Sequence, residues 1–181
     1  MASSTTVVTY TPAQIRAAYK PPSIASATKA QLGAGQTIYI VNAKHDPNIV
    51  AELAAFNSKF SLPSCSNRTL TATTTLPLTA ASSSSCELVI AYSTSGAALS
   101  NTAPAYDSGW AAEIALDVQW AHAIAPLARL VLIEAPDASV NNLAGAIRLA
   151  TRMGPGVVSM SFGANEAVGS PAWRAALPPR A

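Results

Sequence analysis

Charged residues are scarce in this 181-residue sequence: only 11% are Asp, Glu, Lys or Arg, where soluble domains have about a quarter. The formal net charge is +2 and basic residues do not gather in runs, so a nucleic-acid or membrane-surface interface has no electrostatic basis. Hydrophobic residues make up 50% of the chain, yet the longest candidate stretch, residues 110–133, is interrupted by charged residues and a proline. That interruption excludes a transmembrane helix and favours a buried, alanine-rich core. The first residues also lack the charged and apolar regions of a signal peptide, so none is expected in this sequence.

Cysteine is almost as scarce. Cys65 and Cys86 are the two cysteines, and they bracket 20 residues rich in Ser and Thr. A disulfide across this loop would contribute roughly 3 kcal/mol by restricting the unfolded chain, with two unpaired thiols as the alternative. An oxidising compartment is implied only if the bridge forms. No Cys/His group has the spacing of a metal site and no G-x-G-x-x-G follows the first predicted strand, so neither zinc nor a dinucleotide is expected.

Apolar segments and helix signals alternate along the chain. Short apolar runs predict buried strands at residues 36–41, 87–92, 129–134 and 157–161. Cap residues and helical spacing predict helices at about residues 12–19, 49–59, 110–124 and 141–152. Thr11 with Gln14 forms the predicted cap of the first helix, and Asp107 or Ser108 caps the third. Long crossovers between apolar strands are typical of an α/β fold, here a parallel sheet of about four strands with helices on both faces. The Ser/Thr-rich residues 63–85 are predicted to be a surface excursion.

Two carboxylates stand out on the predicted helix at 110–124. Glu113 and Asp117 are four residues apart and therefore share one face of a largely apolar helix. Two carboxyl groups buried together raise the pKa of at least one of them unless cations compensate, and active sites use this arrangement to keep a base. The alternative is structural: Glu113 complements the helix N-terminus, and Asp117 pairs with an arginine. Spacing alone leaves both interpretations open.

Several segments together resemble a known family. The helix with Glu113 and Asp117 resembles the E-x-x-x-D helix of the sedolisin (serine-carboxyl) peptidases, which are distant relatives of subtilisin. Further segments resemble the family in the same order, and the resemblance extends from residue 10 to about 166; these segments are residues 10–19, 46–49, 54–57, 121–128 and 156–163. The resemblance implies a subtilisin-like three-layer sandwich and an endopeptidase that works at acidic pH.

The resemblance also implies roles for individual residues. Glu113 would be the general base that takes the proton of a serine nucleophile, and Asp117 would hold Glu113 in place. Ser161, Phe162 and Gly163 match the strand-end segment that pairs with the substrate backbone. The substrate would be a polypeptide, and the enzyme would be secreted or periplasmic. The calcium site of the family belongs to its C-terminal half, so no cofactor is expected in this chain.

The sequence departs from the family pattern in ways that bear on activity. It has no G-D-x-G for the oxyanion aspartate and no G-T-S for the nucleophile, and it has Asn42 where relatives commonly have Asp. We therefore divide the chain into an N-terminal arm (1–10), a partial peptidase catalytic domain (11–163) and an irregular tail (164–181) that we interpret as a truncation or frameshift. The chain alone is expected to be inactive. Its exposed sheet edge is expected either to meet a missing C-terminal half or to self-associate.

Other interpretations remain beside this one. A non-catalytic remnant, such as a binding module or pseudogene product, is the alternative from another functional class. An α/β-hydrolase elbow at Ser161 would need a later histidine, and none follows. His45 is predicted to be a solvated loop residue. His122 lies about half a turn around the helix from Glu113 and is predicted to be structural.

Overall fold

The computed structural model describes residues 9–163, so most of the predicted arm and all of the predicted tail lie outside the described residues. The helices are α1 (Pro12–Tyr19), α2 (Ile49–Phe60), α3 (Ser108–Ile124) and α4 (Val140–Met153), with a short 3₁₀ turn η1 (Ala30–Leu32). The strands are β1 (Thr37–Ala43), β2 (Cys65–Thr69), β3 (Cys86–Ser93), β4 (Leu99–Ser100), β5 (Arg129–Ala135) and β6 (Val157–Ser159). Among these helices, none is long and apolar enough to cross a membrane.

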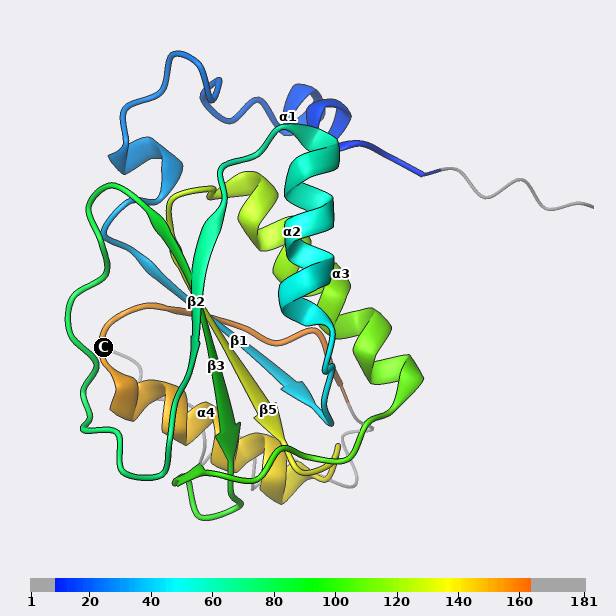
Figure 1. The fold of residues 1–181 in the computed structure, drawn as a ribbon, viewed down its shortest axis with the longest axis vertical. Helices are drawn as coiled ribbons and strands as arrows, with labels where there is room; N and C mark the ends of the chain where they lie inside the picture. The colour runs from blue at the N-terminus through cyan, green and yellow to red at the C-terminus, as the bar shows by residue number, and fades with distance from the viewer. Residues whose placement is uncertain (1–8, 164–181) are drawn as a thin grey trace, which may run out of the picture.

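One six-stranded sheet organises the described residues, with the strand order β2-β3-β5-β1-β6. All neighbours in this order are parallel, and β4 adds a short antiparallel pair at the end of β3. Helices α2 and α3 cover one face of the sheet and α4 covers the other (Figure 1). The predicted α/β fold, a parallel sheet with helices on both faces, is confirmed.

The predicted number of about four strands is wrong, because β2 and β4 were not foreseen. Strand β2 lies within the Ser/Thr-rich stretch predicted to be a surface excursion, and residues 66–69 in it are exposed. Its backbone pairs with β3 from Cys65 opposite Cys86 to Thr69 opposite Ile90. An edge strand needs backbone partners on one side but no apolar side chains, so hydrophobic patterning does not detect it.

Alternating residues of the central strands build a core on each face of the sheet. On the face of α2 and α3, Ile40 and Leu132 lie side by side in β1 and β5, and Ile114 of α3 packs over them fully buried. On the other face, Val41 and Ile133 pack with the buried side of α4, which consists of Leu143, Ala144, Ala146, Ile147, Leu149, Ala150 and Met153. Burial on both faces explains why these strands read as continuous apolar runs.

Side-chain caps decide where the helices begin. Thr11 and Gln14 form the predicted capping box of α1. For α3 the sequence left Asp107 and Ser108 as alternatives. The structure selects Asp107, whose carboxylate accepts the N–H groups of Gly109 and Trp110 at 3.0 Å. The helix therefore starts at Ser108, and its second turn is the one that carries the first of the two carboxylates discussed above.

The predicted disulfide between Cys65 and Cys86 is present and joins the first residues of β2 and β3. His122, from the last turns of α3, is fully buried against this bridge. Burial lowers the pKa of His122 below its ordinary value of 6.5, although a hydrogen bond with the backbone of Pro63 opposes the shift. A buried, contact-making position agrees with the structural role predicted for His122.

Candidate active site

Glu113 and Asp117 lie one turn apart on α3, and both side chains are half-buried. The residues that follow them, Ile114 and Val118, are fully buried beneath the sheet. These apolar contacts fix the rotation of α3 about its axis, and with it the directions in which the two carboxylates project. Glu113 and Asp117 therefore project from one defined side of α3, as their spacing in the sequence predicts.

Asp117 is held from two sides. Nδ2 of Asn42 donates a hydrogen bond to Oδ2 of Asp117 at 3.0 Å, and Oγ of Ser161 donates to Oδ1 at 2.8 Å. Both carboxylate oxygens therefore accept a hydrogen bond from a neighbouring side chain. Within residues 9–163 no hydrogen bond joins Asp117 to Glu113.

The register between β1 and β6 explains how Ser161 reaches Asp117. These strands are parallel, and Ile40 lies opposite Ser159. Two residues further along the two chains come Asn42 and Ser161, which the same register brings to one level of the sheet. Asn42 is fully buried and Ser161 is exposed. One donor to Asp117 therefore comes from the core and the other from the surface.

Glu113 lines an open groove of about 410 Å³ at the start of α3. On the helix side its wall also contains Asp107, Gly109 and Trp110, and the facing wall is the segment that follows β6, namely Ser161, Phe162 and Gly163. The groove therefore brings Glu113 together with all three residues that the resemblance assigned to substrate binding. Asp117 adjoins this wall through its hydrogen bond with Ser161.

A second polar cluster lies at the carboxyl end of β5, and the sequence analysis missed it. Glu134 is fully buried; its Oε2 lies 2.6 Å from Nδ1 of His45, and its Oε1 accepts the N–H of Asp46 at 3.1 Å. The prediction of a solvated His45 is wrong, since only 18% of its side chain is exposed. Burial raises the pKa of Glu134 above its ordinary value, and the hydrogen bonds from Asp46 and His45 oppose part of that shift. The sequence signal was a single glutamate ending an apolar strand.

The contact between Asn42 and Asp117 and the cluster around Glu134 belong to one layer of side chains. Asn42, Glu134 and Tyr92 are register partners in β1, β5 and β3, so their side chains project from the same face of the sheet. The ring of His45 meets the ring of Tyr92 edge-on at 5.5 Å, and burial followed by the charge of Glu134 raises the pKa of Tyr92. This layer closes the apolar core at the carboxyl ends of the strands, where parallel α/β sheets bind their ligands.

Potential metal ligands gather elsewhere. Within residues 9–163, the group of three or more such side chains that lie close together is Cys65, Cys86 and His122. It sits at the amino ends of β2 and β3, at the opposite end of the sheet from the groove. The groove thus offers carboxylates, a hydroxyl and backbone groups as its chemistry.

No protein-family model matches the chain, and no curated protein sequence matches it. Solved structures do match. One is Pseudomonas sedolisin, a serine-carboxyl proteinase solved in complex with two molecules of pseudo-iodotyrostatin. The match has a TM-score of 0.51 and 17% sequence identity, and it covers 81% of this chain and 32% of that one.

This chain has a sedolisin-like fold. At 17% identity the likeness shows the fold alone, and the chain spans 32% of the length of the structure it matches. The sedolisin-like fold accounts for the parallel sheet and for its covering helices.

Proposed function

We propose that this chain forms the part of a serine-carboxyl endopeptidase that carries the general base and one wall of the peptide-binding groove. The observation that supports this most directly is the groove itself, which combines Glu113 with Ser161, Phe162 and Gly163. The chain after β6 lies at the outer side of the described sheet. An extended polypeptide laid beside it can pair backbone to backbone as an added strand, which is how many peptide-binding proteins use a sheet edge.

In this proposal Glu113 is the general base and Asp117 is a positioning residue. A carboxylate in the groove can take the proton of an attacking hydroxyl, and a low working pH suits a carboxylate base. Asp117, held by Asn42 in the core, fixes the hydroxyl of Ser161 and therefore the wall that faces Glu113. Asp117 thus acts on the position of the substrate, through Ser161, and on Glu113 through the shared helix.

We also propose that the isolated chain does not cleave peptides. The sequence contains neither G-T-S nor G-D-x-G, the motifs that carry the nucleophile and the oxyanion aspartate in the family. Ser161 directs its proton to Asp117 rather than to Glu113. Catalysis then requires a second polypeptide segment that supplies both groups, together with the calcium site of the family. A secreted or periplasmic location belongs to the same proposal.

The same groove favours a second candidate, a peptide-binding module that has lost catalysis. Both candidates require an extended peptide to bind along Ser161, Phe162 and Gly163. They differ in whether Glu113 still serves a reaction once the missing groups are supplied. Peptide binding therefore tests the site, and turnover separates the two candidates.

Peptide binding can be measured by fluorescence anisotropy at about pH 4, with labelled peptides from an unfolded protein. Among residues 9–163, no heavy atom lies within 4 Å of a Cβ built at Gly163, and Gly163 lines the groove, so we expect Gly163→Val to keep the fold and to narrow the groove. We expect this variant to bind peptide at least about tenfold more weakly, equivalent to about 1.4 kcal/mol. Thr69→Val, on the exposed face of β2 at the other edge of the sheet, is the matched control and should bind as the parent chain does.

Turnover is assayed under the same conditions, first with the chain alone and then with the C-terminal part of a sedolisin added. We expect no cleavage by the chain alone, and cleavage in the mixture that Glu113→Gln abolishes. Cleavage by the chain alone that Glu113→Gln removes would show that it needs no second segment. Peptide binding without cleavage in the mixture favours the binding module, and absence of binding rejects both candidates.

A further inference from the structure

The disulfide lies against a buried histidine at the amino ends of β2 and β3. Nδ1 of His122 is 3.5 Å from Sγ of Cys65 and 3.6 Å from Sγ of Cys86, and the ligand atoms of the three residues all lie within 4.8 Å of one another. His122 and Cys86 are buried, whereas Cys65 is half-buried. The peptidase chemistry proposed above makes no use of this cluster.

The hydrogen bond on the far side of the imidazole decides which nitrogen faces the sulfurs. Nε2 of His122 lies 2.8 Å from the carbonyl oxygen of Pro63. A carbonyl oxygen can only accept, so Nε2 carries the proton of the neutral ring and Nδ1 keeps a free lone pair toward the sulfurs. A histidine that ligates a metal through one nitrogen commonly donates its other N–H to a backbone carbonyl in this way.

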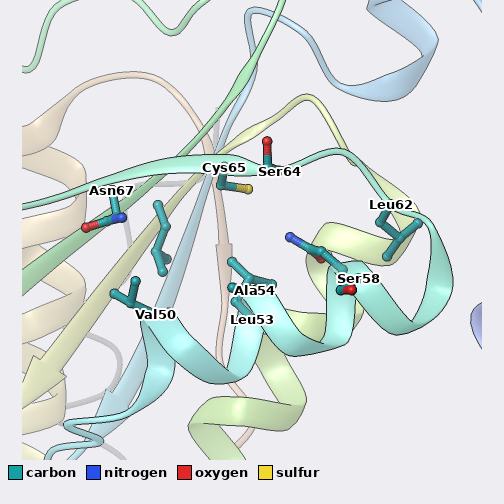
Figure 2. A pocket seen from close by; sticks show the side chains of 10 residues that line it. Val50, Leu53, Ala54, Ser58, Leu62, Ser64, Cys65 and Asn67 are labelled. Carbon is teal, nitrogen blue, oxygen red and sulfur yellow. The ribbon is translucent and has the colours of Figure 1, made fainter.

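Cys65 also lines a hollow of about 290 Å³ between β2 and α2. Figure 2 shows Cys65 on the strand above α2, with Leu53 and Ala54 on the helix beneath it. The lining of this hollow includes the polar side chains of Asn57, Ser58 and Ser64, so it has both the room and the hydrogen-bonding groups to hold water.

We propose that reduction of the bridge between Cys65 and Cys86 converts the cluster into a zinc site, with two thiolates and Nδ1 of His122 as ligands. A dithiol reductant supplies two electrons and two protons: the S–S bond breaks, both cysteines become thiols, and the reductant becomes a disulfide. Zn²⁺ then replaces the two thiol protons, which pass to solvent, while the neutral imidazole adds its lone pair. The charges of Zn²⁺ and two thiolates cancel, as a buried position requires.

The position of His122 already fits such a site. Tetrahedral zinc with Zn–S distances of about 2.3 Å and Zn–N distances of about 2.0–2.1 Å separates sulfur and nitrogen by roughly 3.6 Å. The separation between Nδ1 of His122 and Sγ of Cys86 is already 3.6 Å, so neither the ring nor Cys86 has to move. The change that remains is a separation of the two sulfurs, which rotation of the half-buried Cys65 side chain into the hollow supplies. A water molecule from the hollow then occupies the fourth coordination position of the zinc ion.

The ligand set selects the class of metal. Two thiolates and an imidazole suit zinc and other borderline or soft ions, whereas calcium and magnesium prefer oxygen ligands. This site is not visible in the sequence, because Cys65, Cys86 and His122 lack the spacing of known zinc motifs. Strand pairing and the packing of α3 bring them together instead.

The test uses the full chain in oxidised and reduced forms. A phosphine opens the bridge without adding thiol ligands and is removed under anaerobic conditions. Co²⁺ then serves as the spectroscopic probe and Zn²⁺ as its competitor. We expect the reduced chain to bind one equivalent of Co²⁺ with a thiolate-to-cobalt charge-transfer band that Zn²⁺ displaces, and the oxidised chain to bind none.

Variants separate the three ligands. Cys65→Ser and Cys86→Ser should each lose the charge-transfer band, and His122→Gln should keep both thiols but weaken zinc binding by at least about tenfold. His45→Gln is the matched control, because His45 is the other histidine of the chain and contacts Glu134 instead. It should bind zinc as the parent chain does.

Thermal unfolding of the oxidised and reduced chains is measured as well, because reduction of the disulfide can destabilise the fold. Zn²⁺ should raise the unfolding midpoint of the reduced chain and leave that of the oxidised chain unchanged. A reduced chain that is unfolded without metal should refold when Zn²⁺ is added, because the ligands meet only in the fold. A reduced chain that neither binds Co²⁺ nor gains stability from Zn²⁺, or a His122→Gln variant that binds zinc as tightly as the parent, overturns the proposal.

Discussion

Ser161 donates a 2.8 Å hydrogen bond to Asp117 across 44 residues of chain, and this contact ties the segment after β6 to helix α3. The other oxygen of Asp117 accepts a hydrogen bond from Asn42 in β1. One carboxylate therefore links the core of the sheet, a covering helix and the wall of the groove. Substitution of Asn42, Asp117 or Ser161 should therefore lower both the stability of the fold and the affinity for peptide.

The substitution Asn42→Asp should make folding depend on pH. It places a second carboxyl group beside Asp117 at a fully buried position. Carboxyl groups that share a site hold a proton between them, so the pKa of the pair rises in the folded state. A carboxyl pKa raised by folding gives stability at low pH that is lost as the pH rises. We expect a loss of about 3 kcal/mol in the free energy of unfolding at pH 7, mostly recovered at about pH 4, in urea titrations.

Asn42→Ala is the control for that experiment. It removes the donor to Asp117 without adding a charge, so it should cost about 1–3 kcal/mol with no comparable recovery at acidic pH. Equal losses for Asn42→Asp at both pH values would contradict the contact between positions 42 and 117.

Glu134→Gln should change how stability varies with pH above about pH 4.5. Burial raises the pKa of Glu134 above its ordinary 4.5, so between the unfolded and the folded pKa the folded chain keeps a proton that the unfolded chain has released. The protonated carboxyl therefore favours folding at low pH, and this contribution disappears as the pH rises through the folded pKa. Glutamine has no proton to lose. The free energy of unfolding of the variant, relative to the parent chain, should increase with pH by up to about 1.4 kcal/mol per unit.

Chemical denaturation at several pH values measures this difference. Glu87→Gln is the matched control, because Glu87 forms a partly exposed ion pair with Arg68 and the same substitution there should cost no more than about 1 kcal/mol. A Glu134→Gln difference that stays constant or falls with rising pH would argue that burial does not dominate the pKa of Glu134.

Gly145→Ala should destabilise the chain although alanine is the better helix former. A Cβ at Gly145 in α4 would lie 2.7 Å from the carbonyl oxygen of Ser95 and 2.8 Å from that of Thr94. The backbone would have to shift, and such overpacking costs about 1–3 kcal/mol, more than the gain of about 1 kcal/mol in helix propensity. Thermal and urea unfolding should show a net loss, while Asn141→Ala on the exposed side of the same helix should stay within about 0.5 kcal/mol. A stabilised Gly145→Ala would mean that α4 does not pack this closely on the turn after β3.

The sequence was most informative where side chains face the core. The four apolar runs became β1, β3, β5 and β6, and the cap at Thr11 and the carboxylate spacing on α3 were found where expected. It was uninformative where the backbone alone decides the structure. Strand β2 has a polar, exposed sequence, and it forms because its backbone can pair with β3 at an edge.

The amino-acid sequence by itself determined the α/β architecture and the position of Glu113 and Asp117 on one helix face, because hydrophobic periodicity and helix spacing are local properties of the chain. Only the tertiary structure decided what surrounds those carboxylates. Parallel register set Asn42 and Ser161 on either side of Asp117, and packing brought His45 to Glu134 and His122 to the disulfide. Each of these contacts joins residues far apart in the chain, and the order in which strands pair is a property of the whole sheet that no local pattern encodes.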